Sequence, residues 1–261
     1  MARKTIGLAL SGGGARGFSQ VGVLKALAAN GIVPDMVAGT SAGSAVGAFV
    51  AAGMTVDEIV GLTAEMTWRT AVRPVVSPMG LFSNRPLGSF IRKNLPVNEI
   101  SELKLPYAAV AFDIVSGEEV VISNGDIAEA VRASCAVPGI FTPVRTNDGK
   151  VLVDGGVTSI MPVDQVRAMG ADIVIGVDLV SCGASFRSDP KTAVGVMIRS
   201  ALTLLRTSAL EQRLRADIVI DPAIAHIRPD QLKRKQELLE LGEAAALERI
   251  EEIKAMAGES V

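Results

Sequence analysis

The chain has 261 residues, of which 49% are hydrophobic and 21% charged, so it is long and apolar enough to bury a core and is not disordered in bulk. Its net charge of −2 argues against a nucleic-acid-binding protein. Two distant cysteines and the single His226 exclude a disulfide scaffold and a histidine-based metal site, and we expect no metal and no cofactor.

The first 65 residues alternate between patterns typical of strands and of helices. Apolar runs that end in glycine predict buried strands, and apolar residues at helical spacing predict helices. In chain order we expect a strand over residues 5–11, a helix over 15–30, a short strand over 35–39, a small-residue helix over 42–52, and a further helix begun by a capping box of Thr55 and Glu58.

Two apolar stretches in this region resemble targeting or membrane segments. The run over residues 6–10 is too short for a signal peptide, and glycines and Arg16 follow it at once. Residues 36–56 carry no charge and space Gly39, Gly43 and Gly47 like a packed membrane helix, but their small side chains transfer only weakly into lipid. We therefore expect a cytoplasmic protein, either free or peripheral at the inner membrane surface.

Residues 66–98 interrupt the alternation and predict an irregular flap. The segment has four prolines, five basic residues and no acidic residue, and its apolar side chains include Trp68, Met79 and Phe82. A short helix is expected near residues 86–93. Arginines beside exposed apolar groups suit an anionic lipid surface, which predicts transient membrane contact. A basic loop that covers an edge of the core explains the composition equally well.

The alternation returns after residue 98. We expect strands over residues 107–115 and 119–123, a helix over 126–134, a hairpin of 140–145 and 150–153, a helix over 162–169, a strand over 172–178, a helix over 191–214, a strand over 216–220 and a C-terminal helix over 229–257 that begins at Pro229. This order predicts one α/β domain over residues 1–261, with a mainly parallel sheet between layers of helices.

The first candidate motif is a G-x-S-x-G sequence made by Gly39, Ser41 and Gly43. A strand is expected before it and a helix after it. Such a sharp turn lifts a serine hydroxyl off the sheet, and the helix N-terminus favours negative charge developing beside it. The motif predicts a nucleophilic serine at Ser41, although a glycine-rich turn between a tightly packed strand and helix gives the same pattern.

The second motif is the glycine-rich turn that starts at Gly12. Successive backbone N–H groups at a helix start suit a phosphate or an oxyanion. Gly12, Gly14 and Gly17 also satisfy the G-x-G-x-x-G pattern of dinucleotide-binding oxidoreductases, but the acidic residue at the expected distance, Asp35, precedes its strand instead of following it. A nucleotide-triphosphate loop is excluded because Phe18 stands where a lysine is required.

The third motif places Asp154 at the end of a strand, followed by Gly155 and Gly156. It predicts a carboxylate at a strand end with room for substrate beside it, although Asp-Gly turns are also common in proteins without such a role. Serine, carboxylate and amide donors together indicate acyl transfer. His226 would complete a Ser–Asp–His order, but a lone histidine is more often a surface or packed residue. A Ser–Asp dyad is therefore favoured.

These motifs, in this order, resemble the bacterial patatin-like phospholipase family, which is related to plant patatins and to neuropathy target esterase. The family pattern is G-G-G-x-R/K-G, then G-x-S-x-G, then D-G-G/A. Residues 133–141 also resemble the family's A-S-x-A-x-P-x-x-F segment. The resemblance runs from Ile6 to about Val177. One departure is that Thr158-Ser159-Ile160 precede Met161-Pro162, where many relatives have an asparagine.

The resemblance implies a patatin-like three-layer α/β/α fold and a lipid acyl hydrolase acting on a phospholipid, a lysophospholipid or another fatty-acyl ester. It implies Ser41 as nucleophile and Asp154 as base. Backbone N–H groups of Gly12, Gly13 and Gly14 would form the oxyanion hole, supported by Arg16. Two other classes stay open: a dinucleotide-binding oxidoreductase that uses residues 12–17, and a non-catalytic regulatory relative that kept the fold.

Overall fold

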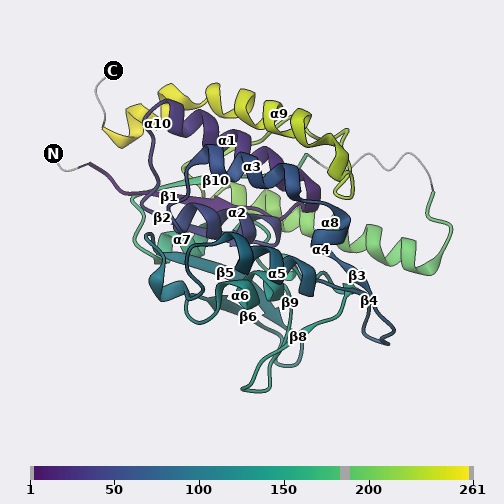
Figure 1. Cartoon of the computed structure of the whole chain (residues 1–261). Helices are drawn as coiled ribbons and strands as arrows, with labels where there is room; N and C mark the ends of the chain where they lie inside the picture. The colour runs from purple at the N-terminus through teal and green to yellow at the C-terminus, as the bar shows by residue number, and fades with distance from the viewer. Residues whose placement is uncertain (1–2, 183–188, 259–261) are drawn as a thin grey trace.

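The computed structural model describes residues 3–182 and 189–258, and a mainly parallel sheet of eight strands forms its centre (Figure 1). Strands β11, β10, β1, β2 and β5 pair in parallel in that order, while β6 and β9 pair antiparallel with β5, and β8 with β9. Their bounds are β1 Ile6–Leu10, β2 Met36–Thr40, β5 Tyr107–Asp113, β6 Glu118–Ile122, β8 Val144–Arg145, β9 Val151–Asp154, β10 Ile173–Val177 and β11 Ile218–Ile220.

Helices cover both faces of this sheet. Ile6, Leu8 and Leu10 of β1 belong to the larger apolar core, which includes α1, α2, α9 and α10, whereas Ala9 faces α7 in a smaller core. The helices are α1 Phe18–Ala29, α2 Ala42–Ala51, α3 Val56–Glu65, α4 Trp68–Ala71, α5 Arg85–Asn94, α6 Ile127–Ser134, α7 Val163–Ala168, α8 Ala193–Arg213, α9 Lys235–Leu247 and α10 Ile250–Ala257. The predicted α/β class, with a mainly parallel sheet between helices, is confirmed.

Helices α1 and α9 lie side by side across the top of Figure 1, and two glycines set their separation. A Cβ atom built on Gly22 would lie 1.9 Å from the Leu239 carbonyl oxygen, and one built on Gly242 would lie 1.8 Å from the Ser19 carbonyl oxygen. Any side chain larger than hydrogen at either position therefore forces the two helix backbones apart.

The segment over residues 66–98 is more regular than the sequence predicts. It contains α4 and α5 together with β3 Arg73–Pro74 and β4 Gly80–Ser83, and β4 pairs in parallel with β7 Gly139–Phe141. Phe90 and Ile91 of α5 are buried, and α5 packs on α6. The expected helix is present, and the buried apolar residues of α5 and the pairing of β4 make the segment more regular than expected. Its role as a flap stays a prediction.

Two further boundaries differ from expectation. The expected strand over residues 140–145 is split between β7 and β8, which join different sheets. The C-terminal helix does not begin at Pro229: a 3-10 turn at Leu232–Arg234 precedes α9, and α10 is a separate helix. The carbonyl oxygen of Pro229 instead accepts a 2.8 Å hydrogen bond from the Ala15 amide, so this residue ties a loop to the glycine-rich turn.

The uncharged stretch over residues 36–56 forms the buried strand β2 and the helix α2, as expected. Within residues 3–182 and 189–258, no helix combines the length and the apolar character needed to cross a membrane.

Candidate active site

Ser41 stands at a sharp turn between β2 and α2, with φ of 53° and ψ of −122°. Within the described ranges it is the single non-glycine residue with a positive φ. A Cβ atom on Gly39 would lie 2.2 Å from the Gly43 carbonyl oxygen, and one on Gly43 would lie 2.1 Å from the Leu10 carbonyl oxygen. Only glycine fits at these two positions, so the sharp turn that carries Ser41 depends on both of them.

The pairing along β5 explains why Ser41 and Asp154 meet. Strand β6 occupies one edge of β5 over residues 109–113, so β2, paired with residues 107–110, and β9, paired with residues 111–113, must share the other edge. They approach from opposite directions: Thr40 ends β2 beside Val110, and Asp154 ends β9 beside Ala111. The serine after Thr40 therefore turns out of the sheet where β9 begins to occupy the edge.

Asp154 is 5% exposed and Ser41 is 9% exposed. The Asp154 carboxylate accepts a 2.8 Å hydrogen bond from the Gly156 amide, and the Ser41 hydroxyl lies close enough to interact with it. Burial raises the pKa of Asp154 to about 6, and the interactions with Ser41 and Gly156 oppose this rise without cancelling it. The pair is therefore a serine hydroxyl in contact with a carboxylate of unusually high basicity.

Gly155 and Gly156 allow the backbone to pack closely around the Asp154 carboxylate. A Cβ atom on Gly155 would lie 2.2 Å from the Val110 carbonyl oxygen, and one on Gly156 would lie 3.0 Å from Asp154 Oδ1. The departure over residues 158–160 also bears on this turn. The Ser159 carbonyl oxygen accepts a 2.6 Å hydrogen bond from Thr40 Oγ1, which ties the loop after the diglycine to the end of β2.

The glycine-rich turn lies against Ser41, since a Cβ atom on Gly12 would be 3.2 Å from Ser41 Cβ. The Gly12 amide donates a 2.9 Å hydrogen bond to the Ile160 carbonyl oxygen. The prediction that Gly12 supplies a free donor therefore needs correction, because the chain itself uses that N–H. The Gly13 and Gly14 amides make no hydrogen bond within the described part of the chain.

Arg16 supports this turn from inside the protein. Its side chain is buried, Nε donates to the Ile227 carbonyl oxygen at 2.7 Å, and one terminal nitrogen donates to the Leu179 carbonyl oxygen at 2.9 Å. Burial lowers the pKa of Arg16. The guanidinium thus fastens the turn to the segments that follow β10 and β11.

Ser134 and Cys135 adjoin the Ser41–Asp154 pair, although no role was predicted for them from the sequence. Ser134 Oγ accepts a 2.8 Å hydrogen bond from the Ser41 amide and donates a 2.6 Å bond to the Val110 carbonyl oxygen. Cys135 is close to the Ser41 hydroxyl, and burial raises the pKa of its thiol to about 12, so the sulfur stays protonated. Both residues belong to the A-S-x-A-x-P segment, and this motif was the sequence feature from which their place near the site could have been predicted.

The structure does not bring His226 to this pair. Its Nε2 lies 2.9 Å from Glu237 Oε1 on α9, and the side chain is half exposed. The dinucleotide alternative also loses support. Asp35 accepts a 2.7 Å hydrogen bond from the Ile6 amide, at the amino end of β1, whereas the glycine-rich turn follows the carboxyl end of that strand.

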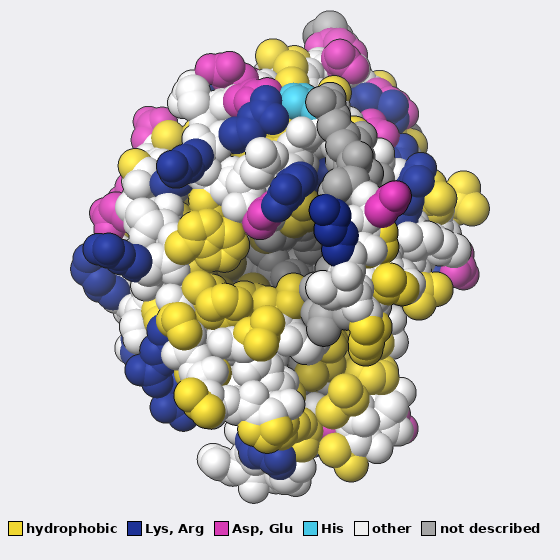
Figure 2. Space-filling model, turned by 90° about the vertical axis from the view of Figure 1, so that its right-hand side faces the viewer, with side chains coloured by type: hydrophobic (Ala, Val, Ile, Leu, Met, Phe, Trp, Pro, Cys, Tyr) yellow, Lys and Arg dark blue, Asp and Glu magenta, His cyan; other side chains and the backbone are white. Residues whose placement is uncertain are grey.

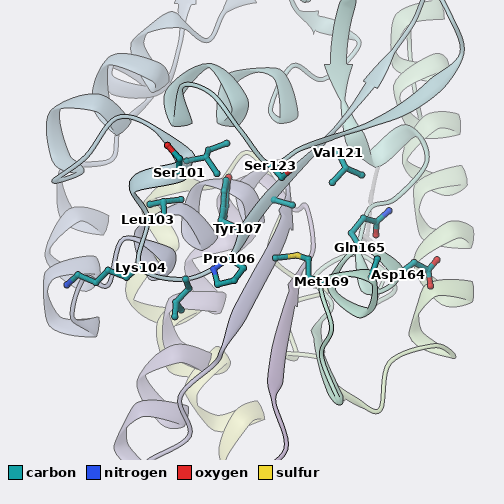
Figure 3. Close-up of a pocket in the computed structure, with 14 residues that line it drawn as sticks. Ser101, Leu103, Lys104, Pro106, Tyr107, Val121, Ser123, Asp164, Gln165 and Met169 are labelled. Atoms are coloured by element: carbon teal, nitrogen blue, oxygen red, sulfur yellow. The ribbon is translucent and has the colours of Figure 1, made fainter.

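A separate hollow of about 820 Å³ opens at the other end of β5 (Figure 3). Tyr107 begins β5 there, whereas Ser41 follows the far end of the parallel neighbour β2. Two of its polar side chains are engaged with residues outside it: Asp164 pairs with Arg215, and Gln165 donates to Glu119. This hollow is therefore not part of the Ser41 site. Within the described ranges, no three His, Cys, Asp or Glu side chains are arranged to hold a metal ion.

The sheet, the serine elbow and the strand-end aspartate define a patatin fold. Two solved structures share it over 96% of this chain: VipD from Legionella pneumophila, with a TM-score of 0.57 and 15% identity over 67% of that chain, and ExoU in its complex with SpcU from the type III secretion system of Pseudomonas aeruginosa, with 0.53 and 17% over 52%. At these identities the likeness concerns the fold alone.

Residues 8–167 match the family model described as patatin-like phospholipase, and the chain belongs to that family. It is 34% identical over 217 residues to an uncharacterized NTE family protein of Mycobacterium tuberculosis, covering 80% of this chain and 60% of that protein. It is 36% identical over 186 residues to human patatin-like phospholipase domain-containing protein 6, covering 68% of this chain but 13% of that protein. The family supports a lipid hydrolase, and the chain spans only part of each relative.

Proposed function

We propose that this protein is a serine lipid acyl hydrolase that uses Ser41 as nucleophile and Asp154 as base. The observation that carries the proposal is the position of the Ser41 hydroxyl beside the buried Asp154 carboxylate, with which it interacts. A carboxylate with an ordinary pKa is a weak base toward a serine hydroxyl, and the raised pKa of Asp154 brings it closer to the operating pH.

In the proposed reaction, Asp154 takes the proton of Ser41 as the serine oxygen attacks the ester carbonyl of the lipid. The tetrahedral intermediate collapses, the proton passes from Asp154 to the departing alcohol oxygen, and the acyl group stays on Ser41. Water then gives its proton to Asp154 and attacks the acyl-enzyme. The fatty acid leaves, and the proton returns to Ser41.

Backbone N–H groups would hold the negative oxygen of the intermediate. The Gly13 and Gly14 amides are the candidates in the glycine-rich turn, because the Gly12 amide already binds Ile160. Helix α2 has no side-chain cap, so the amides of Ala42 and Gly43, next to Ser41, are further candidate donors, whereas the Ser44 amide already binds the Ser41 carbonyl oxygen. Removing a single donor of this kind typically costs about 10²–10³ in rate.

The substrate class we propose is a fatty-acyl ester of a membrane lipid, as the family membership suggests. Apolar side chains at the molecular surface support a lipid substrate. Figure 2 shows hydrophobic side chains around a hollow on the face where β3, β4 and the end of α8 project in Figure 1. The exposed ones include Trp68 and Leu81 near these strands, and Met197 and Leu204 on α8. Peripheral attachment to the cytoplasmic membrane surface belongs to this proposal.

Labelling with a fluorophosphonate probe and peptide mapping tests the proposal. We expect the probe on Ser41 of the wild type, and no labelling in Ser41→Ala or Asp154→Ala. His226→Ala is the matched control and should label like the wild type. Loss of labelling in His226→Ala would contradict the dyad. Absence of labelling in folded wild type, with lipid vesicles present as well as absent, would favour a non-catalytic relative.

A further inference from the structure

A basic groove lies between α3, α4 and α5, outside the Ser41 site. It has a volume of about 630 Å³, and Pro86 and the buried Phe90 form part of its wall. Four cationic side chains surround it, with a single carboxylate, Glu65, among them. The cations are Arg69, Arg73, Arg85 and Lys93. A net positive groove on a protein of net charge −2 is a local feature and does not reflect the overall composition.

These cations are largely unpaired, in contrast to their neighbours. Lys93 reaches Glu65 at 3.9 Å, but the guanidinium groups of Arg69, Arg73 and Arg85 form no ion pair or hydrogen bond with any described residue. On the same helix, Arg92 binds both oxygens of Asp126 at 3.0 and 2.9 Å. Arg92 is thus neutralised by the residue that precedes α6, whereas the guanidinium groups of the groove are left for an external anion.

The groove shares its segment with exposed apolar side chains. Arg73 belongs to β3, and Arg85 begins α5 two residues after β4 ends. The connection between β3 and β4 projects from the body of the protein (Figure 1). Val76 in that connection is fully exposed, and Leu81 of β4 is 60% exposed. Apolar groups at a tip with guanidinium groups at its base suit a phosphate-rich membrane surface, where the tip enters the acyl boundary.

This segment is also joined to the candidate active site. Strand β4 pairs with β7 through Phe82 and Phe141, and the Asp154 amide binds the Ala136 carbonyl oxygen three residues before β7 begins. We propose that the groove binds the phosphate group of an anionic lipid and so docks the β3–β4 hairpin, next to the Ser41 site, on the membrane. The binding does not depend on the chemistry of Ser41.

Trp68 makes the proposal directly measurable. It is the chain's only tryptophan, it is half exposed, and it precedes Arg69 on α4. The Ser41→Ala protein is mixed with vesicles of phosphatidylcholine, or of phosphatidylcholine and phosphatidylglycerol in equal parts. We expect a blue shift of tryptophan emission, and co-sedimentation, only with the anionic vesicles. Inorganic phosphate is titrated in a parallel arm without vesicles.

The variant Arg69→Ala/Arg73→Ala/Arg85→Ala should lose roughly a hundredfold in binding, since each cation near an anionic surface contributes about fivefold. Its matched control is Lys4→Ala/Lys25→Ala/Lys254→Ala, which has the same net charge and should bind like the wild type. All three arginines are exposed, so both variants should melt like the wild type. The single variant Arg69→Gln, expected to lose about fivefold, repeats the test with a smaller change.

Four results would overturn the proposal: equal losses in the two triple variants, an unchanged affinity of the arginine variant, equal binding to neutral and anionic vesicles, and no binding to either. Tight binding of inorganic phosphate without vesicle binding would assign the groove to a soluble anion instead. Because these readouts use a protein without the Ser41 hydroxyl, their failure leaves the proposed hydrolase untouched, and failure of the labelling experiment leaves the groove untouched.

Discussion

The backbone of Ser41 has a positive φ, which residues other than glycine rarely adopt, and neighbouring residues hold it there. A positive φ at a non-glycine residue costs about 1–3 kcal/mol and persists where the surrounding structure enforces it. Here the enforcing contacts are the Ser134 hydroxyl on the Ser41 amide and the contact of Gly43 with Leu10. Strain concentrated at this one residue fits a hydroxyl that must stand clear of the sheet.

The first prediction concerns the pH dependence of activity. Asp154 must be ionised to accept the Ser41 proton, and burial raises its pKa to about 6. We therefore expect kcat/KM for a soluble acyl ester to rise about tenfold per pH unit below about 6 and to level off above it. Stopped-time assays in constant-ionic-strength buffers over this range measure the profile.

His226 is the necessary control for this profile, because it is the chain's only histidine and histidine is the side chain that most often serves as a general base. His226→Gln should keep the rising limb in place, since His226 contacts Glu237 and not the Ser41 pair. A rising limb that disappears in His226→Gln would contradict the assignment to Asp154.

The second prediction concerns Ser134. Replacement by alanine leaves the Ser41 amide and the Val110 carbonyl group without their partner, and an unsatisfied buried group costs about 1–3 kcal/mol. Because the lost hydrogen bond holds the turn that carries Ser41, we expect kcat to drop by about tenfold to a hundredfold with KM nearly unchanged.

Steady-state kinetics on Ser134→Ala test this, with Ser116→Ala in an exposed turn as the matched control. A higher KM at unchanged kcat would show that Ser134 acts on substrate binding and not on the turn that carries Ser41.

Ser41 and Asp154 could be predicted as candidate site residues from the sequence because each lies in a short local motif. The roles of Ser134 and of the Gly12 amide could not, because they depend on hydrogen bonds between segments far apart in the chain.

At the scale of elements, the alternation of strands and helices was predictable, whereas the segment over residues 66–98 was not. Prolines and basic residues gave it the composition of a loop, yet Phe90 and Ile91 bury α5 against α6 and β4 joins β7. Neither partner lies in the segment itself. The regular structure of residues 66–98 therefore depends on tertiary packing, which cannot be predicted from the composition of the segment alone.

The third prediction concerns the crossing of α1 and α9. A methyl group at Gly242 would lie 1.8 Å from the Ser19 carbonyl oxygen, so Gly242→Ala should destabilise the fold by about 1–3 kcal/mol or more. Gly61→Ala in α3 is the matched control. Its Cβ atom meets nothing within 4 Å, and alanine favours a helix interior by up to about 1 kcal/mol.

Urea unfolding of the two variants measures both effects. We expect changes of opposite sign, with the midpoint lowered for Gly242→Ala and equal or raised for Gly61→Ala. Equal destabilisation by both substitutions would mean that the glycines matter for reasons other than the distance between the helices.

At the scale of the whole molecule, the buried Asp154 of the candidate active site lowers the free energy of unfolding at neutral pH. An acid whose pKa is raised by folding stabilises the native state when protonated, and that contribution is lost as the pH rises through the folded value. For Asp154 the difference between about 6 and the ordinary 3.8 corresponds to about 3 kcal/mol. The carboxylate should therefore cost stability at neutral pH.

The fourth prediction is that Asp154→Asn stabilises the protein at pH 8 by up to about 3 kcal/mol, and by much less at pH 4. Thermal unfolding at both pH values measures the difference. Asp113→Asn is a control of opposite sign. Hydrogen bonding, chiefly from the Val151 amide, lowers the pKa of Asp113, so its removal should destabilise the protein at neutral pH. A gain for Asp154→Asn that is equal at both pH values would contradict the prediction.

The overall class of fold followed from the sequence, but the arrangement of β2 and β9 on one edge of β5 did not. The apolar pattern of residues 151–154 predicts a strand but does not predict the direction in which that strand runs. The antiparallel direction follows from the register of Asp154 with Ala111, and it is this direction that points Asp154 at Ser41. The sequence thus predicted the members of the pair, and the sheet explains their contact.

The meeting of β2 and β9 from opposite directions also bears on the synthesis of the protein. A nascent chain that has emerged only as far as α5 carries Ser41 but lacks Ser134, which binds the Ser41 amide, and Asp154. Strand β1 likewise acquires its neighbour β10 only after residues 173–177 have left the ribosome. The proposed hydrolase therefore stays inert until residues 151–154 have left the ribosome, and its reactive hydroxyl and base come together only once β9 docks on β5.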